Sequence, residues 1–299
     1  MITVLGSINM DLIATTARLP KPGETVAGSS FSTAAGGKGA NQALAARRAG
    51  ASVRMAGAVG DDPFATEALT LLTNAGTDLS QVRIAPEPTG TAHILVDRKG
   101  ENVIVIVAGA NAVVDETIAK KAVDQMARGD ILMLQLEIPP ASVETALTLA
   151  KAKGVISVIN IAPLTPEAAR LGGMADIVIA NETEFELLAG QSGMTAGERE
   201  AAMERIHAET AQTLIVTLGA DGVVAIRKGT LIHAKGLVVE PVDTVGAGDT
   251  FCGYLAAGLD AGLAFADALR RAAIAGSLAC TKHGAQPSIP MAAAVEKHL

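Results

Sequence analysis

The chain has 299 residues, and 24 lysines and arginines against 31 aspartates and glutamates give it a formal net charge of −7. Its 49% apolar content excludes an intrinsically disordered chain, and the length suffices for a sizeable core in one large or two small α/β domains. The acidic balance and the 2% aromatic content argue against a nucleic-acid or anionic-membrane surface, so we expect a small-molecule partner.

The N-terminal segment Met1–Gly6 reads as an immediate strand, without the basic stretch or cleavage site of a secretory signal. No apolar run approaches the ~18–20 residues that cross a bilayer. Cys252 and Cys280 lie in alanine-rich apolar segments, where we expect unpaired thiols rather than a disulfide. These features predict a cytoplasmic protein.

Short apolar runs alternate with alanine-rich helical stretches, a pattern typical of βα units around a largely parallel sheet. Two helices rich in alanine and leucine are expected over Asp249–Leu259 and Phe265–Thr281. In open α/β sheets ligands bind beyond the carboxyl ends of the strands, so the segments that follow the strands form the candidate site. The predicted buried strands are Ile2–Leu5, Val53–Ala58, Ile131–Leu134, Val155–Ile159, Ile177–Ile179 and Leu214–Thr217.

Two stretches do not fit the βα rhythm, namely Leu12–Ala34 and Gly90–Val107. The second reads as two strands joined at Asp97–Gly100. Such extra β-structure could form a lid over the ligand edge of the sheet or a contact between two subunits. We expect a single domain over residues 1–299, with lid segments at about 12–34 and 90–107.

Asn9 and Asp11 follow the first predicted strand, two positions apart. In an extended chain they point to the same side, where an amide and a carboxylate can bind neighbouring hydroxyl groups. An Asx turn at the strand end is an equally good interpretation.

The segment Gly36–Asn41 is a glycine-rich turn that leads into a helix. A Walker A loop requires Ser or Thr after the lysine, whereas Gly39 follows Lys38, so we reject that motif. The glycines instead allow close approach to a polyol, with Lys38 and Asn41 supplying polar groups. A simple helix start with a solvated lysine remains the alternative.

Carboxylates follow two further strands. Glu137 adds a carboxylate at the same sheet edge. Asn181 and Glu184 have the spacing of a helix capping box, but Glu184 could equally hold a hydrated Mg²⁺.

The segment Asp243–Phe251 carries the strongest local signal, because Gly246 and Gly248 open directly into a helix. Free backbone amides at such a start attract a phosphate or the charge of a transferring phosphoryl group. Asp249 is either a carboxylate stabilised by the helix dipole or a base that takes a proton from an attacking hydroxyl.

Other chemistries lack their motifs. Histidines and cysteines show no metal spacing, and no Gly-x-Ser-x-Gly elbow is present, which argues against zinc, thiol and triad chemistry. The dinucleotide fingerprint fails at its third glycine, since Gly246-Ala247-Gly248 continues with Asp249.

Taken in order, these segments resemble the ribokinase/phosphofructokinase-B family of sugar and nucleoside kinases, from one end of the chain to the other. The resemblance implies a three-layer α/β/α domain with a mostly parallel central sheet and a small β lid that also forms a homodimer contact. It implies an alcohol-acceptor phosphotransferase that moves the γ-phosphoryl group of ATP to the 5-hydroxyl of ribose, with Mg²⁺ and an activating K⁺. The anchoring motifs are Gly6–Asp11, Gly36–Asn41 with Gly50 and Gly60, Gly100–Val103, Ala108–Asn111, Asn181–Glu184, Asp243–Asp249 and Gly284–Ser288.

The resemblance also implies a role for individual residues. Asp249 would be the base, beside an anion hole formed by Gly246, Ala247 and Gly248. The sugar would be held by Asn9, Met10, Asp11, Gly37, Lys38, Gly39, Ala40, Asn41 and Glu137, with Ala92 and Ile94 of the lid packing on it. The nucleotide and Mg²⁺ would contact Asn181, Glu184, Thr217, Leu218, Gly219, Ala220, Asp221, Gly222, Gly248 and Asp249. K⁺ would be surrounded by Asp243, Val245, Ala279, Lys282, Gly284 and Ser288, partly through backbone carbonyls.

Four positions depart from the family pattern. Ala272 and Ala273 replace the Asn or His often found near adenine, which leaves the nucleotide preference open, and His283 changes the loop near the cation. Met10 is bulkier than the alanine of some relatives, and a tighter apolar contact near the sugar could favour 2-deoxyribose. The family also includes kinases for other acceptors, so fructose and a nucleoside are further alternatives. A sugar sensor without catalysis is the alternative from another class of protein.

Overall fold

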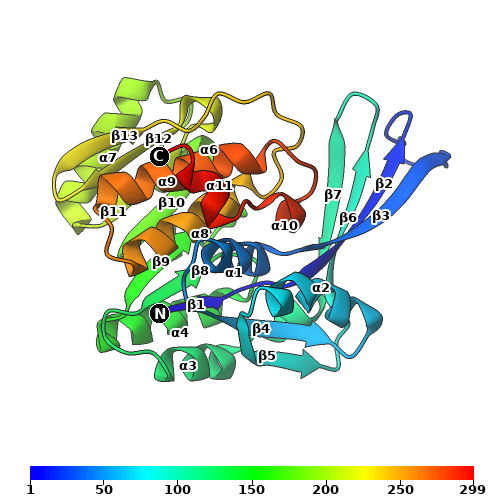
Figure 1. Cartoon of the computed structure of the whole chain (residues 1–299), viewed down its shortest axis with the longest axis horizontal. Helices are drawn as coiled ribbons and strands as arrows, with labels where there is room; N and C mark the ends of the chain where they lie inside the picture. The colour runs from blue at the N-terminus through cyan, green and yellow to red at the C-terminus, as the bar shows by residue number, and fades with distance from the viewer.

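Nine strands form the main sheet of the computed structural model, which describes residues 1–299 (Figure 1). Neighbouring strands are parallel from β11 to β5, whereas β12 and β13 are antiparallel additions at one edge. The order is β13 (Thr230–Ala234), β12 (Val223–Arg227), β11 (Thr213–Thr217), β10 (Ile177–Asn181), β9 (Ile156–Asn160), β8 (Ile131–Leu134), β1 (Ile2–Leu5), β4 (Val53–Gly60) and β5 (Asp78–Ala85).

The strand residues alternate between two apolar cores, one on each face of the sheet. In β8, Ile131 and Met133 belong to one core, while Leu132 and Leu134 belong to the other. This alternation follows from the two-residue period of a strand, and it requires helices on both faces. The result is the three-layer α/β/α architecture expected from the sequence.

Helices cover both faces of the sheet. One layer contains α1 (Lys38–Arg48), α2 (Pro63–Asn74), α8 (Ala247–Asp260), α9 (Phe265–Ala279) and α11 (Ala292–Glu296). The other contains α3 (Glu116–Asp124), α4 (Pro140–Lys153), α5 (Ala168–Gly172), α6 (Glu182–Ala189) and α7 (Ala196–Thr210). Short turns at η1 (Gly109–Val113), η2 (Gly219–Asp221) and α10 (Ala285–Ser288) complete the chain. None of the helices combines the length and the apolar character needed to cross a bilayer.

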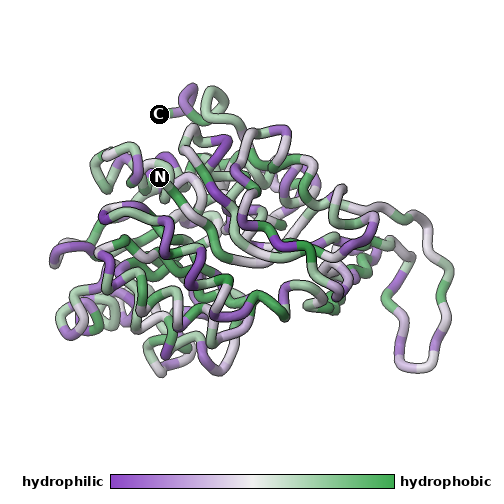
Figure 2. The backbone as a smooth tube through the Cα atoms, turned by 90° about the horizontal axis from the view of Figure 1, so that it is seen from below, coloured by the Kyte–Doolittle hydropathy of each residue, from purple (hydrophilic) through white to green (hydrophobic).

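A second sheet of four strands projects from the side of this body (Figures 1 and 2). Its order is β3 (Gly28–Gly36), β2 (Asn9–Thr16), β6 (Gly90–Val96) and β7 (Asn102–Val107). Strands β2 and β6 are parallel, and the outer pairs are antiparallel. Both stretches that broke the βα rhythm therefore form the small sheet, and we call it the lid sheet.

The six strands predicted from apolar runs are present as β1, β4 and β8 to β11, with ends that shift by one or two residues. Strands β5, β12 and β13 were not predicted. The two predicted helices are α8 and α9, and α9 ends at Ala279 rather than Thr281. Both cysteines are free as expected, although Cys280 is only half-buried.

Candidate active site

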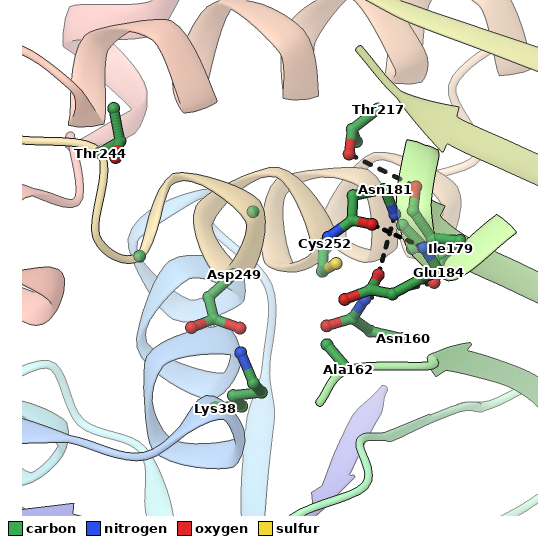
Figure 3. A pocket seen from close by; sticks show the side chains of 13 residues that line it. Lys38, Asn160, Ala162, Ile179, Asn181, Glu184, Thr217, Thr244, Asp249 and Cys252 are labelled. Atoms are coloured by element: carbon green, nitrogen blue, oxygen red, sulfur yellow. Dashed lines mark hydrogen bonds between the residues drawn. The ribbon is translucent and has the colours of Figure 1, made fainter. Parts of the chain in front are cut away.

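A cleft of about 220 Å³ opens where α8 begins beside the carboxyl ends of β9, β10 and β11 (Figure 3). Its wall combines charged and small residues from distant parts of the chain: Lys38, Asn160, Ala162, Ile179, Ala180, Asn181, Glu184, Thr217, Thr244, Gly246, Gly248, Asp249 and Cys252. The segments Gly36–Asn41, Asn181–Glu184 and Asp243–Phe251, which were singled out in the sequence, supply seven of these residues, and the ends of β9, β10 and β11 supply others.

Asp249 is the third residue of α8, and its side chain is only 7% exposed. Asn41 Nδ2 donates to Asp249 Oδ2 at 2.9 Å, and Gln42 Nε2 donates to Asp249 Oδ1 at 3.0 Å. Each carboxylate oxygen therefore has one fixed amide donor, and the orientation of the carboxylate is set by α1. Lys38 extends towards the same carboxylate in the cleft (Figure 3).

The start of α8 is built for an anion. Gly246, the residue before the helix, has φ = +76°, and a Cβ there would meet Ala285 of α10 at 2.8 Å, so glycine is required. No side chain caps the helix, and open space surrounds Gly248. The amides of the first turn can therefore bind a negatively charged group in the cleft.

Asn181 and Glu184 form a full capping box at the start of α6. Asn181 Oδ1 accepts from the backbone of Glu184 at 2.8 Å, and Glu184 Oε2 accepts from the backbone of Asn181 at 2.8 Å. The structural interpretation of this pair is thus confirmed. Because Glu184 also lines the cleft and only Oε2 is used in the cap, Oε1 remains available to a ligand.

A second cavity of about 400 Å³ adjoins the lid sheet, and Asn9, Glu137 and Ile106 are among its lining residues. Glu137 Oε2 accepts from Ser7 Oγ at 2.5 Å and from the backbone of Lys38 at 3.0 Å. Lys38 also lines the first cleft, so this contact joins the two cavities.

At the base of the lid sheet, Asn9 Oδ1 accepts from Asn111 Nδ2 at 2.7 Å. Asp11 lies two positions further along β2 and is 8% exposed, packed against Gly36. Burial raises the pKa of Asp11 to about 7, and the negative charges of Glu137 and Asp249 add to the shift.

Three carboxylates act on one lysine in these cavities. Burial disfavours the charge of Lys38, but Asp249, Glu137 and Glu184 outweigh that effect and raise the pKa of the lysine. Burial raises the pKa of Glu184 as well. Since Lys38 is the only cation among the lining residues, the cleft suits a ligand that brings positive charge or hydroxyl donors with it.

The predicted glycines of the Gly36–Asn41 turn fit the local backbone. Gly37 has φ = +87°, and a Cβ there would meet Asn9 N at 2.7 Å. A Cβ on Gly39 would overlap the backbone of Gly6. Ala40 is fully buried beneath them. These contacts bring the start of α1 against β1 and position Lys38 and Asn41 at the cavities.

Some predicted residues lie apart from the cavities. Met10 is fully buried in an apolar core with Ile8 and Leu44, which accounts for its bulk by packing. Ala92 pairs with Asp11 in the lid sheet, and Ile94 pairs with Ile13 further from its base. Of the predicted nucleotide segment, Thr217 lines the cleft, whereas Leu218, Gly219, Ala220, Asp221 and Gly222 form a turn beyond it, in part within η2.

The residues predicted around K⁺ come from two loops that are joined by Asp243. Its Oδ1 accepts from the backbone of Val245 at 3.0 Å, and its Oδ2 accepts from the backbone of Gly284 at 2.8 Å. Cys280 O accepts from Asp243 N, and Ser288 Oγ donates to Ala285 O. Asp243 thus contacts two of the residues implied around K⁺, Val245 and Gly284. Ala279 is the last residue of α9, and Lys282 lies in the turn that follows it.

Three residues of the hydrogen-bond network around Asp249 received no individual role from the sequence: Gln42, Gln135 and Asn160. Gln135 and Asn160 follow predicted strands, a position that already indicated the site. Gln42 gave no such signal, because it lies within a helix.

Comparison with known proteins gives the family. The model of the pfkB family carbohydrate kinases matches residues 1–292. This chain belongs to that family. A ribokinase of Haemophilus influenzae is 39% identical over 290 residues, which cover 97% of this chain and 95% of that protein.

Solved structures agree with this assignment. The structure of ribokinase from Thermotoga maritima has a TM-score of 0.89 at 32% identity, and the match covers 99% of this chain and 98% of that one. The Arabidopsis thaliana ribokinase complexed with ribose and ATP has a TM-score of 0.88 at 32% identity, covering 99% and 97%. As a pfkB carbohydrate kinase, the chain is a phosphotransferase.

Proposed function

We propose that this kinase transfers the γ-phosphoryl group of ATP to the 5-hydroxyl of D-ribose and releases ribose 5-phosphate and ADP. The observation that carries the proposal is Asp249, a carboxylate held by two amide donors at the uncapped start of α8. The 39% identity to a ribokinase over 97% of this chain supports the acceptor, and a relative bound to ribose and ATP supports both substrates.

In this mechanism Asp249 accepts the proton of the 5-hydroxyl as its oxygen attacks the γ-phosphorus. The new O–P bond forms, the bond to the bridging oxygen of ADP breaks, and ADP leaves. The amides of Gly246, Ala247 and Gly248 would stabilise the charge on the transferring group. Asn9, Asp11, Lys38, Asn41 and Glu137 would hold the sugar, and positioning of this kind contributes much of the rate in phosphoryl transfer.

Mg²⁺ fits the donors at α6. It prefers oxygen ligands and keeps several waters, so a single carboxylate such as Glu184 with its free Oε1 suits it. When bound, the metal would neutralise charge on the phosphates. Asn181 and Thr217 would face the same phosphates, and the turn from Leu218 to Gly222 would adjoin the nucleotide.

K⁺ fits the two loops joined by Asp243, because their donors are oxygens of a carboxylate, a hydroxyl and the backbone. In this arrangement Val245, Ala279, Lys282 and Gly284 contribute backbone carbonyls, and Ser288 lies beside them. The loops also pack behind Gly246, so an ion there would steady the start of α8.

The lid sheet is proposed to close over the sugar and to pair with a second copy of the chain. Its outer strand β7 exposes five consecutive apolar side chains, Val103 to Val107, by 47% to 58% each. Phe31 on β3 is 68% exposed. An exposed apolar surface of this kind favours burial against an equivalent sheet.

The test is ADP release with Mg·ATP and K⁺ over a panel of D-ribose, 2-deoxyribose, fructose, adenosine and no acceptor. We expect the highest kcat/KM for ribose. A higher value for another acceptor would retain the kinase and replace the substrate. Tight ribose binding without ADP release in any reaction would instead indicate a sugar sensor.

A further inference from the structure

We propose that Gln42 is a positioning residue for the base Asp249, and that Gln135 and Asn160 hold it in place. The inference rests on the proposed phosphoryl transfer. It adds a role for a side chain that does not line the cleft and is only 1% exposed.

The amide of Gln42 lies between three elements of the fold. Its Nε2 donates to Asp249 Oδ1 at 3.0 Å and to Asn160 Oδ1 at 3.3 Å. Its Oε1 accepts from Gln135 Nε2 at 2.7 Å. Helix α1 therefore connects α8, β9 and the end of β8 through one side chain.

The direction of each hydrogen bond is determined by the chain itself. A carboxylate only accepts, so Gln42 must present its nitrogen to Asp249 and its oxygen to Gln135. Asn160 Nδ2 donates in turn to Ile179 O at 3.2 Å, which leaves Asn160 Oδ1 to accept. An amide flip of Gln42 would place its Oε1 against Asp249 Oδ1, where two acceptors would meet without a proton between them. The hydrogen-bond network therefore admits one arrangement.

The surroundings keep this network rigid. Gln135 is fully buried, and a Cβ on Gly6 would overlap its Oε1, so Gly6 leaves the space that Gln135 occupies. Buried amides are costly unless they are paired, and Gln42 uses both of its amide atoms, one of them on the carboxylate proposed to take the proton. Gln135 Oε1 is the atom of this network that has no partner. Asn41 fixes the other oxygen of Asp249, so Gln42 determines the rotation of the carboxylate about that contact.

The test is Gln42→Met, which keeps the size of the side chain and removes both amide groups. We expect kcat to fall roughly 10- to 100-fold, the range for loss of a hydrogen bond to a charged group, while KM for the sugar changes by less than about threefold. Gln135→Met should have a smaller effect in the same direction, and it also serves if Gln42→Met fails to fold.

Gln81→Met is the matched control. Gln81 lies in β5, is 6% exposed, and has both amide atoms buried without partners. We expect its kcat to equal that of the wild type, whatever its melting temperature.

Three results would overturn the inference: a kcat within about threefold of the wild type for Gln42→Met, a loss confined to KM, or losses of kcat that follow melting temperature across the three variants. Failure of the proposed function is distinguishable, because it would appear in the wild type as absent turnover of ribose. The ratio of variant to wild-type kcat is then measured on the acceptor that the panel identifies.

Discussion

Asp11 carries a consequence that can be measured through folding stability. Its pKa in the folded chain is raised from 3.8 to about 7, because the carboxylate is buried near Glu137 and Asp249. Between these values the folded chain binds a proton that the unfolded chain does not, so the free energy of unfolding must fall as pH rises from about 4 to about 7. Above that window the full cost of the buried charge is present, on the order of 4 kcal/mol.

Replacing Asp11 by asparagine keeps the shape of the side chain and removes this charge. Relative to the wild type, Asp11→Asn should gain roughly 2–3 kcal/mol of stability between pH 5 and pH 8. Urea unfolding at pH 5, 6, 7 and 8 measures the difference. Asp124→Asn, at an exposed position at the end of α3, is the control and should follow the wild-type curve.

The same shift predicts how the sugar binds. Sugar hydroxyls would donate to the ionised carboxylate of Asp11, so binding below pH 7 should release the proton of Asp11. The affinity for the sugar should therefore fall by up to about tenfold for each unit by which the pH is lowered below 7. Calorimetry in two buffers of different ionisation enthalpy counts that proton. The argument from burial would be refuted if the free energies of unfolding of Asp11→Asn and the wild type changed equally with pH and sugar binding released no proton.

Three further predictions follow from the site. Asp249→Asn should reduce kcat by roughly 10²- to 10⁴-fold without loss of sugar binding by calorimetry, and normal turnover would exclude the mechanism. Glu184→Gln keeps the capping box, so melting temperature should hold while the Mg²⁺ concentration for half-maximal activity rises; an unchanged Mg²⁺ dependence would remove Glu184 from the metal site. Ile104→Lys on exposed β7 should shift a dimer to monomers in light scattering, and an unaffected dimer would place the interface elsewhere.

Much of the site was predictable because a parallel sheet gathers the carboxyl ends of its strands. Ser7 and Glu137 follow β1 and β8, while Asn160 and Asn181 are the last residues of β9 and β10, and all four contribute to the cavities or to their hydrogen bonds. The apolar runs identified these strands because each is buried on both faces. The sheet topology then brings the carboxyl ends of these strands together, which no local motif could indicate.

The missed elements have physical reasons. Strand β5 contains Asp78, Gln81 and Arg83 and lies at the sheet edge, where one side needs no apolar cover. Gln42 and Asp249 are 207 residues apart, and a glutamine in the middle of an alanine-rich helix has the appearance of a surface residue. Its role depends on which element packs above it, and a single sequence does not contain that information.

The structural and functional interpretations of the helix starts prove to be compatible. The cap at Asn181 and Glu184 uses one carboxylate oxygen and orients the other into the cleft, so the capping bonds supply the fixed geometry that a metal ligand requires. At α8, Asp249 lies in the first turn, where the helix dipole favours a negative charge, while amides of α1 fix its rotation. A residue that stabilises a helix start is thereby already positioned, and the proposed catalysis needs a substrate placed against a lone pair of Asp249 that its two amide donors do not occupy.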